Sequence, residues 1–526
     1  MIYVAFLCLF AVAFGQSQDN PSKRIVEKCQ RSVDVAIIGA GASGAYSAYK
    51  LKDKKMTIEV IELTDSIGGR HLTTTLPDVS DVKLELGQRV FSNLHEISMK
   101  LVKELGLTQE EFLDALGEKG NNRFYLRGQT FTQQDLERGV KIPYELTSEE
   151  KQNQAKIVSF YFQKLTGSPL KYMTREERLR VKVIQTNRPL YQHTIDEALD
   201  LVASPEGKQF FKDIVKGQYS IYKDSSALLP FTFELDYNSN NSTFFKIKEG
   251  MDSLPKKLIE KFLKSDPQRN YLTLNRKLEG IQRFQNMTYV LQLKLTKTES
   301  GRTFELGPEE FICAERVILA LPKDSLDHLN WSILKNWKLS TALNALKPVP
   351  EQKIILSFSK PFWLQQEPYK AKVKCTDTIL GSVHDLGSSN NKFLLMTSLN
   401  FGEEVHEMSR LNFQGKAIDG SVPGLLQVTV DLKDRVVSEL TKIFSVKEQI
   451  SVLGGVSKFW TLPPHIGGST VWRAGYHWED IRDTLLRPSF SDNIYIASPD
   501  IAFGTRQAWT EGGLENVEII MEKYIL

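Results

Sequence analysis

The strongest constraint on the fold is a glycine-rich loop between a predicted strand and a predicted helix near the amino end. Residues 33–38 are Val-Asp-Val-Ala-Ile-Ile, which predicts a buried strand, and residues 45–52 predict a helix. The loop before that helix contains Gly39, Gly41 and Gly44. Gly39 allows a tight turn, Gly41 lets the backbone approach a pyrophosphate, and Gly44 lets the helix pack closely on the strand. This order of strand, glycine loop and helix predicts an α/β dinucleotide-binding unit.

A second predicted strand, residues 57–61, strengthens this interpretation because it ends in an acid. Glu62 follows it, 18 residues after Gly44. At this spacing a carboxylate can accept hydrogen bonds from both ribose hydroxyls of an adenosine. The loop and the acid together indicate a dinucleotide site, whereas a glycine loop alone is weak evidence.

The residues that follow bring a second glycine pair and a cation toward the phosphates. Glu62 and the segment Gly68-Gly69-Arg70 resemble the FAD signature of the flavin amine oxidase superfamily, in which the Arg contacts the pyrophosphate. The resemblance implies FAD as cofactor. It also implies an α/β fold with a two-part, Rossmann-like FAD-binding domain, a mixed-sheet substrate-binding domain and a helical insertion.

Three longer strings resemble one secreted branch of that superfamily, the molluscan oxidases of the aplysianin-A, escapin and achacin type. The strings occupy residues 123–129, 200–208 and 472–477. Members of this branch are secreted FAD glycoproteins that resemble L-amino-acid oxidases, often prefer Lys or Arg, and harm microbes through hydrogen peroxide. The resemblance therefore implies an L-amino-acid oxidase.

The resemblance also implies that both ends of the chain bind FAD. Leu278 is expected in the adenine pocket, although burial in a sheet explains it equally well, and Asp500 is expected at the ribityl chain. A last helix should begin after Trp509 with its amino end toward the cofactor. The full expected set is Gly39, Gly41, Ala42, Ser43, Gly44, Glu62, Gly69, Arg70, Gly87, Gln88, Arg89, Leu278, Trp460, Asp500, Trp509 and Thr510.

Two residues are expected to act in catalysis. Lys353 aligns with the family Lys that holds a water against the flavin, and a buried Lys with a lowered pKa can relay protons. Trp509 matches the aromatic wall of the substrate pocket, so it is also a substrate-binding candidate. The alternatives are a surface Lys at a strand edge and an aromatic residue that only packs in the core.

The expected carboxylate clamp departs from the family pattern. Arg89 resembles the Arg that pairs with the substrate carboxylate, for which a planar guanidinium is suited. Its spacing from the preceding glycine is one residue short, and the usual Tyr partner is replaced by Leu399. Arg506 could supply a second cation or could face solvent.

The chain is divided on these patterns into a leader and alternating FAD-binding and substrate-binding parts. Residues 2–14 are almost wholly apolar and too short to span a bilayer, which predicts a secretory signal peptide over 1–15. Capping boxes at Thr108, Thr147 and Thr194 predict helices in the middle of the chain. The predicted parts are 30–100 (FAD, first part), 105–230 (helical and substrate-binding), 231–325 (FAD, second part), 326–480 (substrate-binding) and 481–526 (FAD, carboxyl-terminal part).

Composition narrows the remaining possibilities. With 67 Lys plus Arg against 64 Asp plus Glu, the net charge of +3 disfavours nucleic acid as a partner. The histidines lack a metal-ligand pattern, so no catalytic metal is expected. Outside the leader, the three cysteines allow at most one intrachain disulfide. Candidate glycosylation sequons lie at Asn240, Asn241, Asn286 and Asn330.

Three functions remain open. The first is a secreted L-amino-acid oxidase that uses O2 and an amino acid. The second is an amine or polyamine oxidase, motivated by the altered clamp at Arg89 and Leu399. The third is a defence or egg-mass glycoprotein that retains FAD without turnover. No membrane span is expected in the mature chain, and a homodimer is one of the open oligomeric states.

Overall fold

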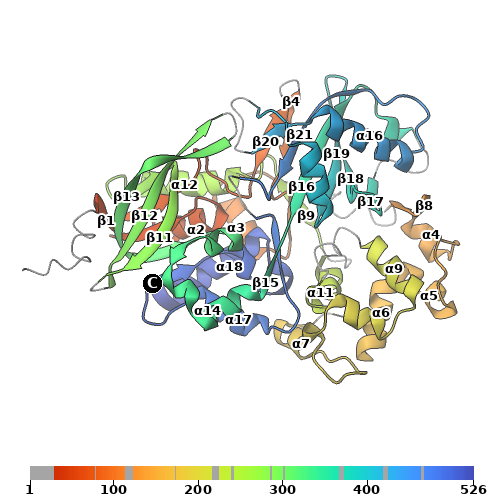
Figure 1. Ribbon diagram of the computed structural model, residues 1–526, viewed down its shortest axis with the longest axis horizontal. Coiled ribbons are helices and arrows are strands. Elements are labelled where there is room, and N and C mark those ends of the chain that lie inside the picture. Colours follow the sequence, from red (N-terminus) through yellow and green to blue (C-terminus); the bar gives the residue numbers. More distant parts are fainter. Residues whose placement is uncertain are drawn as a thin grey trace, which may run out of the picture.

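The computed structural model places two large sheets side by side, with a group of helices beside the second sheet (Figure 1). The sheet nearer the carboxyl end of the chain contains β1, β12 and β13, and the other contains β16, β19 and β21. The structure describes residues 29–76, 79–112, 123–171, 173–215, 224–237, 242–284, 287–299, 302–365, 372–418, 424–463 and 467–526.

The first sheet is built on β1, whose residues from Val35 to Ile38 are all buried. β1 pairs in parallel with β2 on one edge and with β13 on the other, so it is an interior strand, and its run of buried apolar residues is typical of a parallel sheet. Helix α2 (Ala42–Leu51) packs on β1 and β2, and helices α12 (Ser253–Ser265) and α18 (Thr510–Ile520) pack on α2. The strands are β10 (Asn270–Thr273), β2 (Ile58–Ile61), β1 (Arg31–Ile38), β13 (Arg302–Leu319), β12 (Tyr289–Glu299), β11 (Arg276–Arg283) and β14 (Asn330–Trp331), in that order, with β23 (Ile494–Ile496) beside β13.

The second sheet is covered on both faces, because alternate residues of its central strand point to opposite sides. Ile354 and Leu356 of β16 pack with α16 (Val430–Ile443), and Ile355 packs with the β3–β4 hairpin. The strand order is β20 (Leu425–Gln427), β21 (Val452–Phe459), β16 (Glu351–Phe358), β19 (Lys392–Phe401), β18 (Ser382–Ser389), β17 (Lys372–Thr376), β7 (Arg123–Leu126) and β8 (Gln129–Thr132). The hairpin comprises β3 (Thr73–Leu76) and β4 (Val79–Glu85), and α15 (Glu404–Leu411) precedes α16.

Two of the three predicted capping boxes begin helices. Thr147 and Thr194 each accept a hydrogen bond from the backbone three residues on, and the Glu at that position reaches back. The prediction at Thr108 is wrong, because residues 109–111 form β6 and pair with β9 (Phe244–Ile247). The helices of this region are α4 (Gln133–Glu137), α5 (Ser148–Gln152), α6 (Ile157–Thr166), α7 (Arg175–Arg180), α8 (Ile195–Asp200), α9 (Pro205–Ile214) and α11 (Leu228–Tyr237).

The region predicted as helical also contains a hairpin that joins the second sheet. Arg127 and Gly128 both have positive φ, 48° and 75°, and connect β7 to β8 as a two-residue turn. Phe124 and Phe131 stack across the hairpin with ring centroids 5.6 Å apart. The remaining elements are β5 (Phe91–Ser92), β6 (Gln109–Glu111), α3 (Glu96–Glu104), α13 (Lys323–Asp327), α14 (Trp337–Asn344), β15 (Leu346–Val349), β22 (Ser469–Trp472) and α17 (Trp478–Leu486), with short single turns between them.

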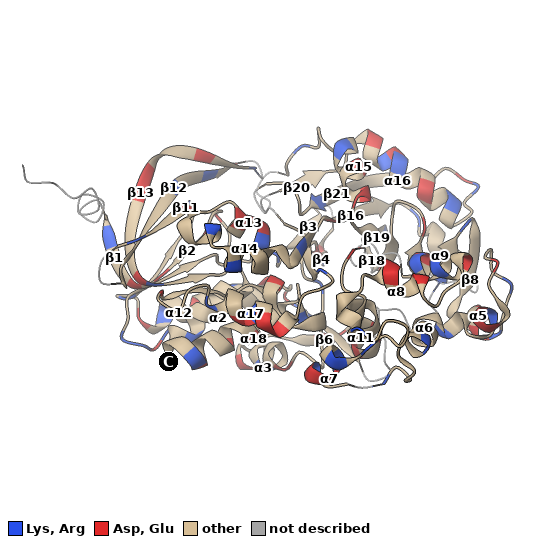
Figure 2. Cartoon of the chain, turned by 60° about the horizontal axis from the view of Figure 1, so that its bottom comes forward, with Lys and Arg blue, Asp and Glu red and all other residues tan. Residues whose placement is uncertain are grey.

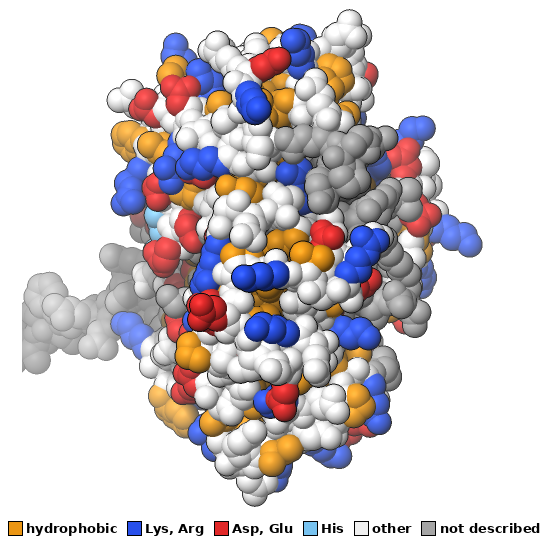
Figure 3. Space-filling view, turned by 90° about the vertical axis from the view of Figure 1, so that its right-hand side faces the viewer, with side chains coloured by type: hydrophobic (Ala, Val, Ile, Leu, Met, Phe, Trp, Pro, Cys, Tyr) orange, Lys and Arg blue, Asp and Glu red, His pale blue; other side chains and the backbone are white. Residues whose placement is uncertain are grey.

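Charges of both signs are interspersed over the surface. Figure 2 shows Lys and Arg beside Asp and Glu on most helices, and the end of the molecule in Figure 3 mixes acidic, basic and apolar side chains. Within the described residues no helix is long and apolar enough to cross a membrane, and no group of three or more His, Cys, Asp or Glu could hold a metal ion. Of the four predicted sequons, Asn330 is exposed on β14, and the others lie outside the described residues, as does the predicted leader.

One disulfide ties the amino end of the described chain to the first sheet. Cys29 precedes β1 and is bonded to Cys313 of β13, with 5.8 Å between the Cα atoms and 284 residues of separation. The third cysteine, Cys375, is buried and its thiol donates to the carbonyl of Asp213 at 2.9 Å. The bridge therefore closes a loop that includes most of the first sheet.

We expect the double variant Cys29→Ser/Cys313→Ser to lose about 2–5 kcal/mol of unfolding free energy, because an uncrosslinked chain gains entropy on unfolding. Denaturant unfolding of both proteins measures the difference. A reductant should lower the stability of the wild type and leave the double variant unchanged. Equal midpoints for the two proteins without reductant would show that the bridge does not contribute.

Candidate active site

The glycine loop lies where the first sheet, α2 and α18 meet. Gly39 has φ +102°, and a Cβ on Gly44 would lie 1.8 Å from the Gly39 carbonyl oxygen, so α2 packs directly on the turn. Gly41 forms a bridge with Gly68, and a Cβ on Gly69 would lie 3.3 Å from Gly41 Cα. Bare backbone from two glycine segments thus forms one surface at the amino end of a helix, which suits a pyrophosphate.

Glu62 lies beside this surface as expected. Its buried carboxylate accepts hydrogen bonds from the backbone N–H of Ala40 at 2.8 Å and from Thr64 at 3.0 Å. Burial raises the pKa of Glu62, while these hydrogen bonds oppose that rise. Leu278 is buried on β11, and that strand begins where Arg276 donates its N–H to the Glu62 carbonyl at 2.8 Å.

The carboxyl end of the chain meets the same surface. Ser43 of α2 lies so close to α18 that a Cβ on Gly513 would be 2.3 Å from its Oγ. Thr510, the first residue of α18, shares a 2.9 Å hydrogen bond with Nε2 of His71. Burial, with the charge of Arg70, lowers the pKa of His71 to about 4, so the imidazole is neutral at physiological pH. The amino ends of α2 and α18 therefore converge on the segment that carries the second glycine pair.

Arg70 and Asp500, expected at different parts of the cofactor, lie together in the structure. The Arg70 guanidinium donates to Asp500 at 2.8 Å and to the carbonyl of Gly468 at 3.1 Å. The other Asp500 oxygen accepts the N–H of Lys323 at 2.9 Å. The pair holds the Arg70 side chain against the carboxyl-terminal segment.

Segment 86–88 connects the glycine surface to the second sheet. A Cβ on Gly87 would lie 1.9 Å from the Arg70 carbonyl oxygen, and Gln88 donates its N–H to the same oxygen at 2.8 Å. From the other side, Lys353 Nζ donates to the Gly87 carbonyl and Trp460 Nε1 donates to the Leu86 carbonyl. Arg70, Lys353 and Trp460 thus meet around segment 86–88.

Lys353 is buried at this junction rather than exposed at a strand edge. It lies on β16 with 4% of its surface exposed, opposite Leu399 of β19 and Lys458 of β21. Burial lowers the pKa of Lys353 to about 8, and the carboxylate of Glu351, 3.9 Å away, opposes that change. Lys458 was missed by the sequence reasoning. Burial lowers its pKa to about 7, and its Nζ lies 4.6 Å from the Trp460 ring centroid.

Arg89 directly follows segment 86–88. Its guanidinium contacts the sulfur of Met396 at 3.9 Å and lies over the Phe112 ring, 5.3 Å from the ring centroid. No carboxylate of the described residues pairs with it. Burial lowers the pKa of Arg89 to about 10, so the side chain remains a cation at neutral pH. Leu399, expected at the position of the family's Tyr partner, lies opposite Lys353 on the neighbouring strand.

Trp509 belongs to an aromatic cluster beside Arg89 and is partly exposed. Its ring stacks on Tyr237, with centroids 5.0 Å and planes 19° apart, and meets the edge of His95 at 5.0 Å. Phe112, Phe233 and Phe244 complete the cluster. The sequence reasoning missed Tyr237 and His95, since neither lies in a motif.

Hydrogen bonds fix the tautomer of His95 in this cluster. Ser92 N–H donates to Nδ1 at 3.2 Å, so the proton is on Nε2, which donates to the Tyr237 hydroxyl at 3.1 Å. Tyr237 in turn donates to the carbonyl of Thr505 at 3.2 Å. Burial lowers the pKa of His95, and the nearby charge of Arg506 lowers it further. One guanidinium nitrogen of Arg506 is buried and has no hydrogen-bond partner in the described structure. Hydrogen bonds therefore hold His95 and Tyr237 in place behind Trp509, and His95 carries no charge at neutral pH.

Comparison with known proteins identifies the class. The family model of flavin containing amine oxidoreductases matches residues 42–516, and the chain belongs to this family. It is therefore an FAD-dependent oxidoreductase. Achacin from Lissachatina fulica is 38% identical over 525 residues, 98% of each chain, and aplysianin-A from Aplysia kurodai is 35% identical over 95% of this chain and 91% of its own.

More distant proteins are similar in sequence or in fold. An L-amino-acid oxidase from Sistrurus catenatus edwardsii is 21% identical over 94% of this chain and 91% of its own. Putrescine oxidase bound to putrescine superposes with a TM-score of 0.64 at 16% identity, over 94% of this chain and 99% of that one. Cyclohexylamine oxidase from Brevibacterium oxydans gives 0.64 at 15% identity, over 93% and 99%. The expected α/β fold of the flavin amine oxidases is confirmed.

Proposed function

We propose that the protein is a secreted L-amino-acid oxidase that converts an L-amino acid, with L-Lys and L-Arg as candidates, to a keto acid, ammonia and hydrogen peroxide, and that the peroxide serves defence. The observation that carries this proposal is the environment of Arg89. Its cation is partly buried beside an aromatic cluster, and no carboxylate of the described residues pairs with it. A substrate carboxylate would supply the missing partner.

We assign the FAD site to the converging glycine segments, because only bare backbone fits there. Gly39, Gly41, Ala42, Ser43 and Gly44, with Gly69 and Arg70, would hold the pyrophosphate. Glu62 and Leu278 would hold the adenosine end. Asp500 and Thr510 would bind toward the flavin end. The remaining residues assigned to the flavin end are Gly87, Gln88, Arg89, Trp460 and Trp509.

FAD, when bound, supplies the two-electron oxidation of the carbon–nitrogen bond and the transfer of electrons to O2. The chain's own residues bind and orient the substrate. Arg89 fixes the carboxylate and thereby the α-carbon, and Trp509 with its aromatic neighbours excludes water. Lys353 holds a proton at Nζ near neutral pH because its pKa is about 8.

Secretion is supported by the Cys29–Cys313 bridge, since disulfides persist mainly in oxidising compartments. It also agrees with the apolar leader over residues 1–15 and with the exposed sequon residue Asn330.

An amine oxidase is the second candidate, favoured by Leu399 opposite Lys353, where no hydroxyl supports a carboxylate. Both candidates are tested by adding L-Lys, L-Arg, L-Phe and a polyamine in turn to the holoprotein without oxygen. Cadaverine, the decarboxylated counterpart of L-Lys, provides the matched control.

We expect one of the amino acids to bleach the flavin band and cadaverine to leave it unchanged. Bleaching by cadaverine alone would replace the proposal with an amine oxidase. A flavin band that no compound bleaches would indicate a cofactor-bearing glycoprotein without turnover.

A further inference from the structure

We propose that Arg178 and Asp236 position the aromatic wall of the substrate pocket, acting on Trp509 through Thr505 and Tyr237. The inference rests on the proposed oxidase function, in which Trp509 lies beside the substrate. It gives α7 and α11 of the helical region a part in substrate selection, although neither helix contains a residue of the expected site.

The Trp509 ring is held by other rings. It is partly exposed, and its indole Nε1 forms no hydrogen bond within the part of the chain that the structure describes. Tyr237 stacks on it and the edge of His95 meets it, each with centroids 5.0 Å away. Ring pairs of these two kinds depend on the angle between the rings as well as on their distance. The orientation of Trp509 therefore depends on the groups that fix Tyr237 and His95.

The turn at Thr505 is joined to the end of α11 at two points. The Tyr237 hydroxyl donates to the Thr505 carbonyl at 3.2 Å, and the Thr505 hydroxyl donates to the carboxylate of Asp236. Two hydrogen bonds between the same two segments fix their relative rotation as well as their distance. The turn leads directly to Trp509, whose N–H donates to the Arg506 carbonyl at 3.1 Å.

Asp236 is fixed in turn by Arg178 of α7. The Arg178 guanidinium donates to both Asp236 oxygens, at 2.7 and 2.6 Å, and its Nε donates to the Met173 carbonyl at 3.1 Å. Arg178 is buried and the Asp236 side chain is 16% exposed, so water competes little with this pair. A bidentate pair of Arg and carboxylate also has a defined geometry. Contacts therefore run without a break from α7 to Trp509, and we call Arg178, Asp236, Thr505 and Tyr237 the positioning series.

A second ion pair of α7 provides a comparison. Arg175 donates to both oxygens of Glu515 in α18 at 2.9 Å, and its side chain is 45% exposed. An exposed pair of this kind contributes little to stability. Arg175 thus lies on the same helix as Arg178 and has the same side chain, but its carboxylate partner is not in the positioning series.

The positioning series should matter more for large substrates than for small ones. A large side chain packs on the Trp509 ring and loses that contact when the ring tilts, whereas a methyl side chain makes little contact with the wall. Loss of a contact that is present both before and during the reaction raises KM and leaves kcat unchanged. The expected defect is therefore in KM and depends on side-chain size.

The first test compares Thr505→Val with Thr505→Ser in the holoprotein, with rates expressed per bound flavin. Valine keeps the branched shape of threonine without the hydroxyl, and serine keeps the hydroxyl. We expect Thr505→Val to raise KM about tenfold for the best of L-Lys, L-Arg and L-Phe, because a misplaced wall weakens binding of a large side chain. Its kcat, and its KM for L-Ala, should stay the same, and Thr505→Ser should match the wild type.

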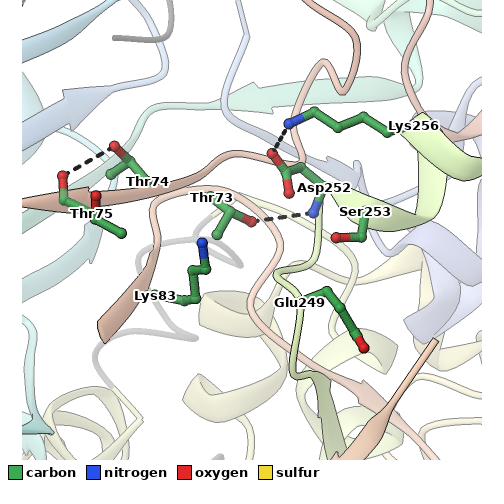
Figure 4. A pocket seen from close by; sticks show the side chains of 8 residues that line it. All are labelled: Thr73, Thr74, Thr75, Lys83, Glu249, Asp252, Ser253 and Lys256. Atoms are coloured by element: carbon green, nitrogen blue, oxygen red, sulfur yellow. Dashed lines mark hydrogen bonds and ion pairs between the residues drawn. The ribbon is translucent and has the colours of Figure 1, made fainter. Parts of the chain in front are cut away.

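Thr74→Val is the control for loss of a threonine hydroxyl. Thr74 lies on β3 at a solvent-open pocket beside the amino end of α12 (Figure 4). Its hydroxyl donates to the Thr75 carbonyl, and no member of the positioning series lines that pocket. This variant should match the wild type with every substrate.

A second measurement requires no substrate. Protein labelled with 5-fluorotryptophan gives a fluorine NMR signal for each tryptophan, and Trp509→Phe identifies that of Trp509. We expect Arg178→Gln to shift or broaden the Trp509 signal, because Asp236 then loses its bidentate partner. Arg175→Gln and Thr74→Val should leave the signal in place.

An unchanged Trp509 signal in Arg178→Gln, together with an unchanged KM in Thr505→Val, would overturn the proposal. A lower melting temperature of Thr505→Val with equal losses for large and small substrates would also overturn it, since the positioning series would then have a structural role only. If the wild type oxidises no amino acid, the oxidase proposal fails, and the NMR comparison by itself decides whether Arg178 positions Trp509.

Discussion

Replacement of Arg89 by Leu is expected to lower kcat/KM for the best amino-acid substrate by about 10² to 10³-fold. Removing one partner of a buried charge pair typically costs about 2–5 kcal/mol, because the other charge is left unpaired. The guanidinium remains protonated at neutral pH, since its lowered pKa is still about 10. Steady-state kinetics of the two proteins measure the change, which should appear mostly in KM.

Two controls separate substrate binding from structure in this prediction. Arg89→Lys keeps the charge but loses the planar fork, so it should recover part of the activity. Because Arg89 is also assigned to the flavin end of the FAD site, kcat/KM of both proteins is expressed per bound flavin, which separates a loss of cofactor from a loss of substrate binding. In the described structure the Arg89 guanidinium contacts the Met396 sulfur and the Phe112 ring. If amino acids and decarboxylated amines lose activity equally, Arg89 does not bind the carboxylate.

The geometry of the candidate cofactor site could be predicted because its parts are local in sequence. The turn at Gly39, the close approach at Gly44 and the acid at Glu62 each follow from a short motif, and the structure brings them together. Each of these short motifs specifies a residue type together with the backbone geometry that requires it.

The middle of the chain could be predicted only in part. The capping box at Thr147 begins a helix, whereas the same pattern at Thr108 does not, because pairing with β9 satisfies the backbone there. The β7–β8 hairpin had a local signal in the Arg127-Gly128 turn, but without Asn or Asp before Gly that signal was weak.

The surroundings of Lys353 and Trp509 could not be predicted, because their partners come from distant segments. Lys353 and Gly87 are 266 residues apart, and Tyr237 and Thr505 are 268 apart. Side chains that meet through tertiary packing leave no spacing pattern in the sequence. This is why Tyr237 and His95 became candidates only with the structure.

The second large effect is expected at Gly44. A valine side chain there would begin 1.8 Å from the Gly39 carbonyl oxygen and 3.0 Å from its carbon, distances that no contact tolerates. The turn and α2 must separate, so the loop N–H groups no longer converge on the pyrophosphate. We therefore expect Gly44→Val to retain less than about a tenth of the FAD of the wild type, measured as flavin absorbance per protein.

Gly454→Ala is the matched control, because the nearest atom to its new Cβ is Ser357 Oγ at 3.8 Å, an ordinary contact. It should retain FAD fully. Circular dichroism distinguishes a folded protein without cofactor from an unfolded one, since the second sheet has its own apolar clusters around Ile354 and Ile355. A folded Gly44→Val protein that binds FAD normally would mean that the pyrophosphate does not lie at this turn, and the cofactor assignments that depend on it would have to be withdrawn.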